Sequence, residues 1–197
     1  LLSASVDGWF TLPLTVPNYL AGFVGKPVLP LDAPEVSAAI ERVQKRTDAL
    51  LNCGGTHRPK WFHRKLGDIL YEGCGVARDE AGLLDALTKV RELREEFWRD
   101  VKVVGTGNRL NQELEKAGRV ADFIELGEVM ILDALDRRES AGAHFRNEYA
   151  TEAGEAKRND DDWCAVSAWE TRPDGTKVRH SEPLSFSLID LQVRDYR

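Results

Sequence analysis

The residues best suited to chemistry gather in one stretch, RRESAGAHFRNEYATEAGEAKRNDDDW, at positions 137–163. It mixes basic, acidic, small and aromatic residues around a single imidazole, His144, and it shows no hydrophobic period. Such a composition is compatible with an active site, a ligand-binding loop, or a charged turn that holds a helical domain against another part of the protein. The predicted elements around the stretch help to separate these interpretations.

Most polar side chains of this stretch lie just past the end of a predicted helix, where Gly142 provides a sharp turn. Arg and His side chains there can bind the free carbonyl groups of the helix and are favoured by its negative end. Glu139 can pair with a nearby arginine. We favour a polar cap that packs a domain, and contact with a ligand or a neighbouring domain stays open. The residues concerned are Arg137, Glu139, Ser140, His144 and Arg146.

A second candidate is VVGTGNRL at 103–110, in which Gly105 and Gly107 follow two valines. A dinucleotide fingerprint needs a third glycine, where this chain has Leu110, and a strand–helix–strand unit, where it has helices. We therefore predict an ordinary loop.

Two thiols and two imidazoles, Cys53, His57, His63 and Cys74, could in principle bind zinc. Their spacing matches no compact zinc motif, and a C-x-x-C pair is missing. We predict no metal site and expect His63 to make a polar contact between helices.

The acidic clusters are a further candidate for catalysis. Glu95 and Glu96 form a pair and residues 160–162 a triplet, but charged runs of this kind are usually solvated. We therefore predict that these acidic residues are solvated. No serine lies in a G-x-S-x-G elbow, and no cysteine has an activating histidine beside it in the sequence.

Composition excludes some classes of protein. The chain has 27 Lys and Arg against 33 Asp and Glu, a net charge of −6, which disfavours a nucleic-acid-binding protein. No apolar run approaches the roughly 20 residues that span a bilayer, so membrane association would go through a partner subunit. Three widely spaced cysteines indicate reduced thiols in the cytoplasm.

The chain opens with LLSASVDGWF, without an initiator Met, which we interpret as a piece of a longer protein. Residues 1–31 are apolar and rich in proline, which predicts a short helix and then an irregular, covered segment. Apolar residues then recur at helical spacing. Four helices are predicted, from about Pro34 to the Gly54-Gly55 pair, over Pro59–Glu72, over Asp79–Asp100, and over Asn108–Arg138, where Gly127 could bend or divide the helix.

Each predicted helix carries an apolar stripe. The stripes comprise Val36, Ile40, Val43, Leu50 and Leu51 in the first helix, Phe62, Leu66, Ile69 and Leu70 in the second, Leu83, Leu87, Val90, Leu93 and Phe97 in the third, and Leu110, Leu114, Ala117, Ala121, Ile124, Leu132 and Leu135 in the fourth.

After residue 163 the pattern changes to β-forming residues on both sides of Pro173-Asp174-Gly175, which predicts a hairpin. An extended segment, LSFSLIDLQV, follows. The predicted fold is mainly α: an antiparallel helical bundle with a short apolar N-terminal segment and a small C-terminal β-hairpin. The predicted domains are 1–31, 32–139 and 140–197.

Several motifs resemble, in the same order, the C-terminal region of succinate dehydrogenase and fumarate reductase flavoprotein subunits. They are R137-x-E139-S140-x-G142-x-H144-x-R146 with E148-Y149, R158-N-D160-D-D-W163, NQELEKAGRVADFIELGE at 111–128 and LLSASVDGWFTLP at 1–13. The resemblance covers essentially the whole chain. One departure is Ala141, where relatives often carry Arg or Cys.

The resemblance implies a helical domain that follows an FAD-binding domain, whose end would be residues 1–31. In this family, the histidine that binds FAD covalently and the side chains that bind and protonate the substrate all precede the region present here. The only cofactor contact implied in this span is Leu1, whose backbone N–H would approach the flavin at a helix N-terminus. The span alone is then structural and not catalytic.

The resemblance also implies the setting of the whole enzyme. It interconverts succinate and fumarate and passes electrons to an iron–sulfur subunit and to quinone. It is held at the cytoplasmic face of the bacterial inner membrane by membrane anchor subunits. Two alternatives stay open: another flavoenzyme on the same scaffold, such as L-aspartate oxidase, and a helical interaction module without redox chemistry.

Overall fold

The computed structural model describes residues 5–189, 191 and 192. The contacts of the chain divide it into two compact units, Leu1–Gln44 and Lys45–Arg197. The domain boundaries after residues 31 and 139 stay predictions. Within the described part of the chain, none of the helices is both long and apolar enough to cross a membrane.

The first unit begins with a π-helical turn η1 (Asp7–Thr11) that runs directly into α2 (Leu12–Ala21). Residues 26–30 have no regular structure, so the predicted helix followed by an irregular segment is confirmed. The prediction of a covered segment is wrong. Its large apolar side chains, such as Val28, which is 92% exposed, and Leu29, remain open because none of the described elements of this unit packs over them.

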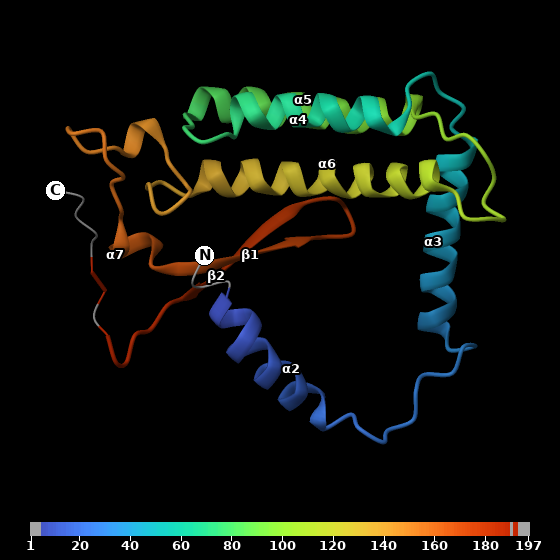
Figure 1. Ribbon diagram of the computed structural model, residues 1–197, viewed down its shortest axis with the longest axis horizontal. Helices are drawn as coiled ribbons and strands as arrows, with labels where there is room; N and C mark the ends of the chain where they lie inside the picture. Colours follow the sequence, from blue (N-terminus) through green and yellow to red (C-terminus); the bar gives the residue numbers. More distant parts are fainter. Residues whose placement is uncertain (1–4, 190, 193–197) are drawn as a thin grey trace. The chain divides into compact units, whose positions relative to one another are not determined.

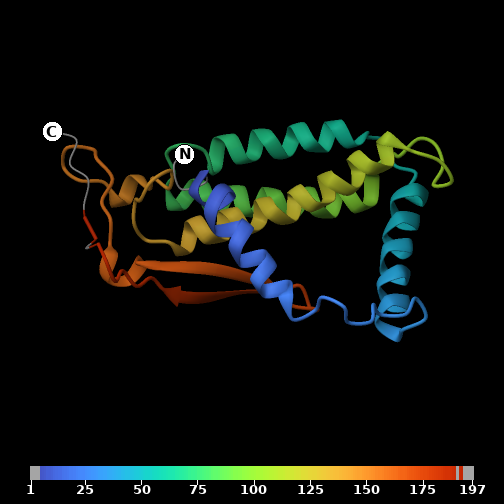
Figure 2. The same cartoon turned by 60° about the horizontal axis from the view of Figure 1, so that its bottom comes forward.

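The second unit is built on three long helices that lie side by side (Figures 1 and 2): α4 (Pro59–Gly73), α5 (Glu80–Asp100) and α6 (Gln112–Asp136). Short connections make α5 antiparallel to both neighbours, so α4 and α6 run in the same direction. Asp79 caps α5 by accepting a hydrogen bond from the backbone N–H of Gly82, and Asn111 caps α6 in the same way. α3 (Pro34–Asn52) precedes the bundle.

The core of the bundle comes from the predicted stripes. All five residues of the α5 stripe are buried, which confirms that prediction: Leu83, Leu87, Val90, Leu93 and Phe97. Phe62 of α4 meets Phe97 edge-on, with ring centroids 5.2 Å apart. In α3 only Leu50 is buried, and Ile40 and Val43 are exposed. The helical period fixes a face but does not decide whether another element covers it.

Two predictions for the fourth helix are wrong. α6 begins at Gln112, after its cap Asn111, so Leu110 lies in the preceding loop and is 94% exposed. Gly127 does not divide the helix, which is continuous to Asp136. Instead, an added Cβ at Gly127 would lie 3.3 Å from Cδ1 of Leu70, so the glycine lets α4 and α6 approach closely.

The predicted hairpin is present. β1 (Ala165–Thr171) pairs antiparallel with β2 (Lys177–Pro183), with Ala165 opposite Pro183. Gly175 takes a φ of 85° in the turn, a conformation that glycine adopts without strain. A short helix, α7 (Asp160–Trp163), and a 3₁₀ turn, η2 (Asn147–Tyr149), lie between α6 and the hairpin. The structure thus confirms a mainly helical fold with a bundle and a C-terminal hairpin.

A two-stranded hairpin is marginal by itself, so its contacts with α6 matter. The Trp169 indole Nε1–H donates to Asp133 Oδ1 at 2.8 Å. Arg179 Nε lies 2.6 Å from Asp136 Oδ2. These polar contacts fix the hairpin on the C-terminal half of α6, and the hairpin ribbon runs beside that helix in Figure 2.

Candidate functional site

The polar stretch that opens at Arg137 folds into a compact cluster at the C-terminal end of α6. We call it the arginine–histidine cluster and define it by these residues: Arg78, Arg137, Glu139, Ser140, His144, Arg146 and Glu148. Glu139, Ser140 and Arg146 are almost fully buried, which is unusual for charged side chains unless each has partners. The contacts below show what those partners are.

Arg146 closes the end of α6. Its Nη1 donates to the carbonyl oxygens of Ala134 and Leu135 at 2.9 and 3.2 Å. Its Nε donates to Glu148 Oε2 at 3.2 Å. Glu148 Oε1 in turn accepts from the backbone N–H of Glu80, at the first residue of α5. The arginine and the glutamate therefore join a negative helix end to a positive one, as helix dipoles favour.

His144 is held as a neutral imidazole by two different partners. Its Nδ1 lies 3.0 Å from Nη1 of Arg78, which can only donate, and its Nε2 lies 3.0 Å from the carbonyl oxygen of Arg137. Nε2 therefore carries the proton. Burial lowers the pKa of His144, and the positive charges of Arg78, Arg137 and Arg146 lower it further, against the raising effect of the hydrogen bond to Arg137.

Glu139 and Ser140 tie the cluster to the segment before the hairpin. Glu139 accepts from Arg137 Nε at 2.8 Å and from the backbone N–H of Asn159 at 2.9 Å. The Ser140 hydroxyl accepts from the backbone N–H of Arg146 and donates to its carbonyl oxygen. The predicted capping by Arg and His, and the predicted pairing of Glu139 with an arginine, are confirmed.

The buried polar atoms of this cluster all have partners within the chain. Across the described residues, no buried side-chain nitrogen or oxygen lacks a hydrogen-bond partner. The side chains that looked most chemical in the sequence are therefore engaged in joining α5, α6 and the segment 137–163. Arg78 was missed by the sequence analysis, since its separation of 66 residues from His144 leaves no local signal.

The four potential zinc ligands do not converge. The Cys53 thiol faces the carbonyl oxygen of Trp98, and Cys74 is buried, which raises the pKa of its thiol. His57 contacts Asp100, whereas the His63 ring lies 5.7 Å from the ring of Phe123 on α6. The His63 contact does join two helices, but through aromatic rings. Within the described ranges, no group of three or more His, Cys, Asp or Glu side chains could hold a metal.

The remaining sequence candidates lie apart from one another. Gly105 and Gly107 lie in the loop between α5 and α6, as predicted. Glu96 pairs with Lys65 of α4 at 2.7 Å, and Asp160 pairs with Arg158 at 2.6 Å. Leu1, the predicted cofactor contact, lies outside the described residues.

One carboxylate at the opposite end of the bundle is strongly perturbed. Asp100, at the end of α5, faces Nδ1 of His57 at 2.5 Å and accepts from the Thr56 backbone N–H and hydroxyl at 2.8 Å. The hydrogen bond from His57, followed by those from Thr56, lowers the pKa of Asp100 to about 2. Thr56 and Asp100 both approach the same ring nitrogen, so this is a junction between loops and not a nucleophile–base–carboxylate relay.

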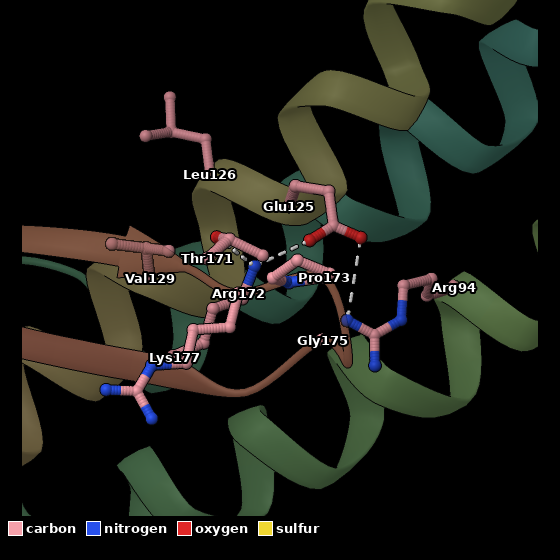
Figure 3. A pocket seen from close by; sticks show the side chains of 9 residues that line it. All are labelled: Arg94, Glu125, Leu126, Val129, Thr171, Arg172, Pro173, Gly175 and Lys177. Carbon is pink, nitrogen blue, oxygen red and sulfur yellow. Dashed lines mark hydrogen bonds and ion pairs between the residues drawn. The ribbon is translucent and has the colours of Figure 1, made fainter. Parts of the chain in front are cut away.

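A cavity of about 690 Å³ lies between the hairpin turn and the bundle (Figure 3). Glu125 of α6 stands at its centre, 2.9 Å from Lys177 Nζ of β2 and 3.5 Å from Arg94 Nη1 of α5. Arg94 also lies 2.5 Å from the buried Glu128. The ion pair between Lys177 and Glu125 therefore docks the hairpin on α6 at this pocket. The sequence analysis predicted the hairpin but not this docking.

Comparison with known proteins identifies the family of this chain. Residues 63–196 match the family described as fumarate reductase flavoprotein C-term. The succinate dehydrogenase flavoprotein subunit of Bacillus subtilis (strain 168) is 26% identical over 197 residues, which is 100% of this chain and 32% of the relative. The fumarate reductase flavoprotein subunit of Escherichia coli (strain K12) is 30% identical over 111 residues, 56% of this chain and 18% of the relative. The chain thus spans about a third or less of these relatives.

Solved structures agree on the fold. An E. coli quinol fumarate reductase flavoprotein matches with a TM-score of 0.69 at 24% identity, over 81% of this chain and 26% of that chain. An adenosine-5-phosphosulfate reductase matches with a TM-score of 0.63 at 15% identity, over 89% of this chain and 28% of that chain. Different reductases therefore share this fold, so the fold alone does not choose between them. The sequence match does: this chain belongs to the family of fumarate reductase flavoprotein C-terminal regions.

Proposed function

We propose that this chain acts as the C-terminal part of a succinate dehydrogenase or fumarate reductase flavoprotein subunit. The whole protein would interconvert succinate and fumarate, using covalently bound FAD as its redox group. The observation that carries the proposal is the family match over residues 63–196, together with the likeness of the whole chain to a succinate dehydrogenase subunit.

We propose that the flavin site lies mainly outside the described residues. The glycine-containing loop at Gly105 follows a helix, where a dinucleotide site needs a strand, and the buried cations of the arginine–histidine cluster already have partners. We therefore assign the covalent attachment and the substrate contacts to the rest of the protein. Contact of Leu1 with the flavin, and residues 1–31 as the end of the FAD-binding domain, are part of the same proposal.

The role that this chain's own residues support is mechanical. Arg146 and Glu148 fix α6 against α5, while Trp169, Lys177 and Arg179 fix the hairpin on α6. A rigid helical unit of this kind can hold a flavin-binding domain and a partner subunit in a constant relation.

We further assign an iron–sulfur subunit and membrane anchor subunits as partners, at the cytoplasmic face of the bacterial inner membrane. Support comes from solved relatives: one is described as an Sdh1 complex of Mycobacterium smegmatis, and another as a quinol–fumarate reductase with menaquinol molecules. Association would be peripheral, through these partners.

The activity can be tested on the longer protein that the proposal requires. It should be purified from its source, and succinate-dependent reduction of an artificial electron acceptor measured beside flavin fluorescence in a denaturing gel. Turnover with succinate and a flavin that survives denaturation are expected. A protein that oxidises L-aspartate instead, or that binds no flavin, would overturn the proposal.

The same assay on the 197-residue chain tests the division of labour. With added FAD and acceptor, the chain should give no succinate-dependent reduction above the blank. Measurable turnover would show that the chain contains catalytic groups after all.

A further inference from the structure

A second part of the bundle differs from the arginine–histidine cluster because none of its cations pairs with an acid on another of the described helices. α4 and α6 run in the same direction, and a groove follows the seam between them. At its N-terminal end the groove opens into a cavity of about 230 Å³, whose apolar lining comes from Pro59, Val120 and Phe123. The rim of that cavity carries Lys60 and His63 of α4 and Lys116 and Arg119 of α6.

The groove continues beyond Phe123. His63 and Phe123 also line a second cavity of about 260 Å³, which extends along the seam to Met130. Its floor is apolar and includes Leu66 and Leu70. Phe123 is 41% exposed, Leu126 55% and Met130 45%, at the spacing i, i+3 and i+7 that keeps one helix face in line. The two cavities meet at the contact between the His63 and Phe123 rings and together line one open apolar channel with a basic mouth.

The basic mouth is electrostatically unfavourable as it stands. Lys60 is the second residue of α4, where the helix N-terminus already carries partial positive charge. It forms no ion pair with any residue that the structure describes. Lys116 and Arg119 pair only with acids of their own helix, the half-buried Glu113 and the exposed Glu115. Cations that gather at a cavity in an acidic chain, against a helix dipole, indicate a site for an anion.

We infer that this channel binds a single-chain amphiphilic anion. The carboxylate or phosphate head would lie among Lys60, Lys116 and Arg119, and an unbranched apolar tail would lie along Phe123 toward Met130. The inference is independent of the proposed redox function, since it uses only α4 and α6.

The geometry sets the length of the tail. Arg119 and Met130 are 11 positions apart on α6, which corresponds to about 16 Å of helix at 1.5 Å per residue. A tail of roughly ten to twelve carbons fits that distance. Within this limit, each added methylene should tighten binding by about twofold to fourfold, because part of its surface leaves water in an open groove.

The test titrates the 197-residue chain with hexanoate, octanoate, decanoate and dodecanoate, below their micelle concentrations, by calorimetry. Affinity should rise along the series, and decanol should bind at least about tenfold more weakly than decanoate, the difference expected from losing an ionic contact of about 1.4 kcal/mol. The double variant Lys60→Gln with Arg119→Gln should lose a similar factor. Lys102→Gln, an exposed cation outside the groove, is the matched control and should bind as the parent does.

A second variant tests the tail without touching the head. Gly67 of α4 lines the apolar part, and an added Cβ there meets nothing within 4 Å. Gly67→Leu should fill the channel, so that dodecanoate binds no tighter than hexanoate. Gly118→Leu, also in open space but outside the groove, should leave the series unchanged. Circular dichroism confirms that each variant is folded.

The source of the anion is separated by sedimentation with phosphatidylglycerol vesicles. Co-sedimentation that both the double variant and Gly67→Leu abolish assigns the head to a lipid with one of its chains in the channel, whereas decanoate binding without co-sedimentation assigns a free amphiphile; both support the inference. Co-sedimentation that Gly67→Leu leaves intact, without decanoate binding, would overturn it. Equal affinity for decanol and decanoate, full affinity in the double variant, or no saturable binding in either assay would overturn it.

Discussion

The two ends of the three-helix bundle are closed by different means. At one end, a parallel backbone bridge between Arg78 and Arg146 is reinforced by buried charge: Arg146 and Glu148 join the C-terminus of α6 to the N-terminus of α5. At the other end, the backbone segments approach each other closely, and the side chains of His57 and Asp100 that meet there are partly exposed. The segment at His57 pairs with Val101 in a parallel bridge, and the Lys102 N–H donates to the His57 carbonyl at 2.8 Å. The stability of the first end therefore depends on buried charges, whereas the stability of the second end depends on how closely two backbone segments approach each other.

The largest effect is expected where a buried charge is removed. Arg146→Ala leaves two helix carbonyls and Glu148 without their partner, which should lower the free energy of unfolding by about 3–5 kcal/mol. Arg138→Ala, an exposed neighbour, should change it by less than about 0.5 kcal/mol. Urea unfolding measures both. A loss below about 1 kcal/mol at Arg146 would contradict side-chain closure.

At the backbone-closed end, the most sensitive position is a glycine. A Cβ added to Gly55 would lie 2.0 Å from the backbone carbonyl of Asp100, so Gly55→Ala must push the two segments apart. A cost of about 1–3 kcal/mol is expected, again by urea unfolding. Gly118→Ala, in open space within α6, should instead stabilise the protein by about 0.5–1 kcal/mol. If Gly55→Ala and Gly118→Ala changed the free energy of unfolding alike, the close approach of Gly55 to Asp100 would be refuted.

A smaller effect is expected at His144, which joins Arg78 to the end of α6. His144→Ala should cost about 1–2 kcal/mol at pH 7, since it leaves one donor and one acceptor unpaired. In the complete flavoprotein, it should lower stability or assembly and leave turnover per bound flavin unchanged. Loss of turnover with assembly and flavin content intact would make the residue part of the reaction.

His144 also makes the stability of this end of the bundle depend on pH. The pKa of His144 is lower in the folded protein than its ordinary 6.5, so the unfolded chain takes up the proton first. The stabilisation is therefore complete above pH 6.5 and is lost as the pH falls below it. Thermal unfolding between pH 8 and pH 5 should show this loss in the parent chain, and His144→Ala should be flatter over the same range.

The smallest effect is expected at the other end of the bundle, where Asp100 responds in the lowest pH range. Asp100 has a folded pKa of about 2 against an ordinary 3.8, so its stabilisation is present above pH 3.8 and disappears toward pH 2. The difference in melting temperature between the parent chain and Asp100→Asn should shrink across that window. A difference that stays constant would show that the carboxylate charge is not what holds Thr56 and His57.

The sequence predicted well whatever depends on local pattern. The apolar stripe of α5, the turn at Pro173-Asp174-Gly175 and the capping role of Arg146 follow from periodicity and helix-end chemistry within a few residues. The predictions failed where the burial of a side chain depends on which other element packs against it. Three apolar residues of the predicted stripes are exposed: Ile40, Val43 and Leu110. Gly127 is a residue type that often breaks helices, but here it lets two helices pack closely.

The sequence by itself determined the helices and the hairpin, their apolar faces and the family, because these follow from the spacing of apolar residues and from sequence motifs. Only the tertiary structure decided which charges are satisfied. Arg146 and Lys60 are both cations near helix ends, yet one meets carbonyls and a carboxylate while the other lies in a basic mouth without an ion pair among the described residues. The physical reason is that a charge is stabilised by partners distant in the chain, and only folding brings those partners within a few ångströms.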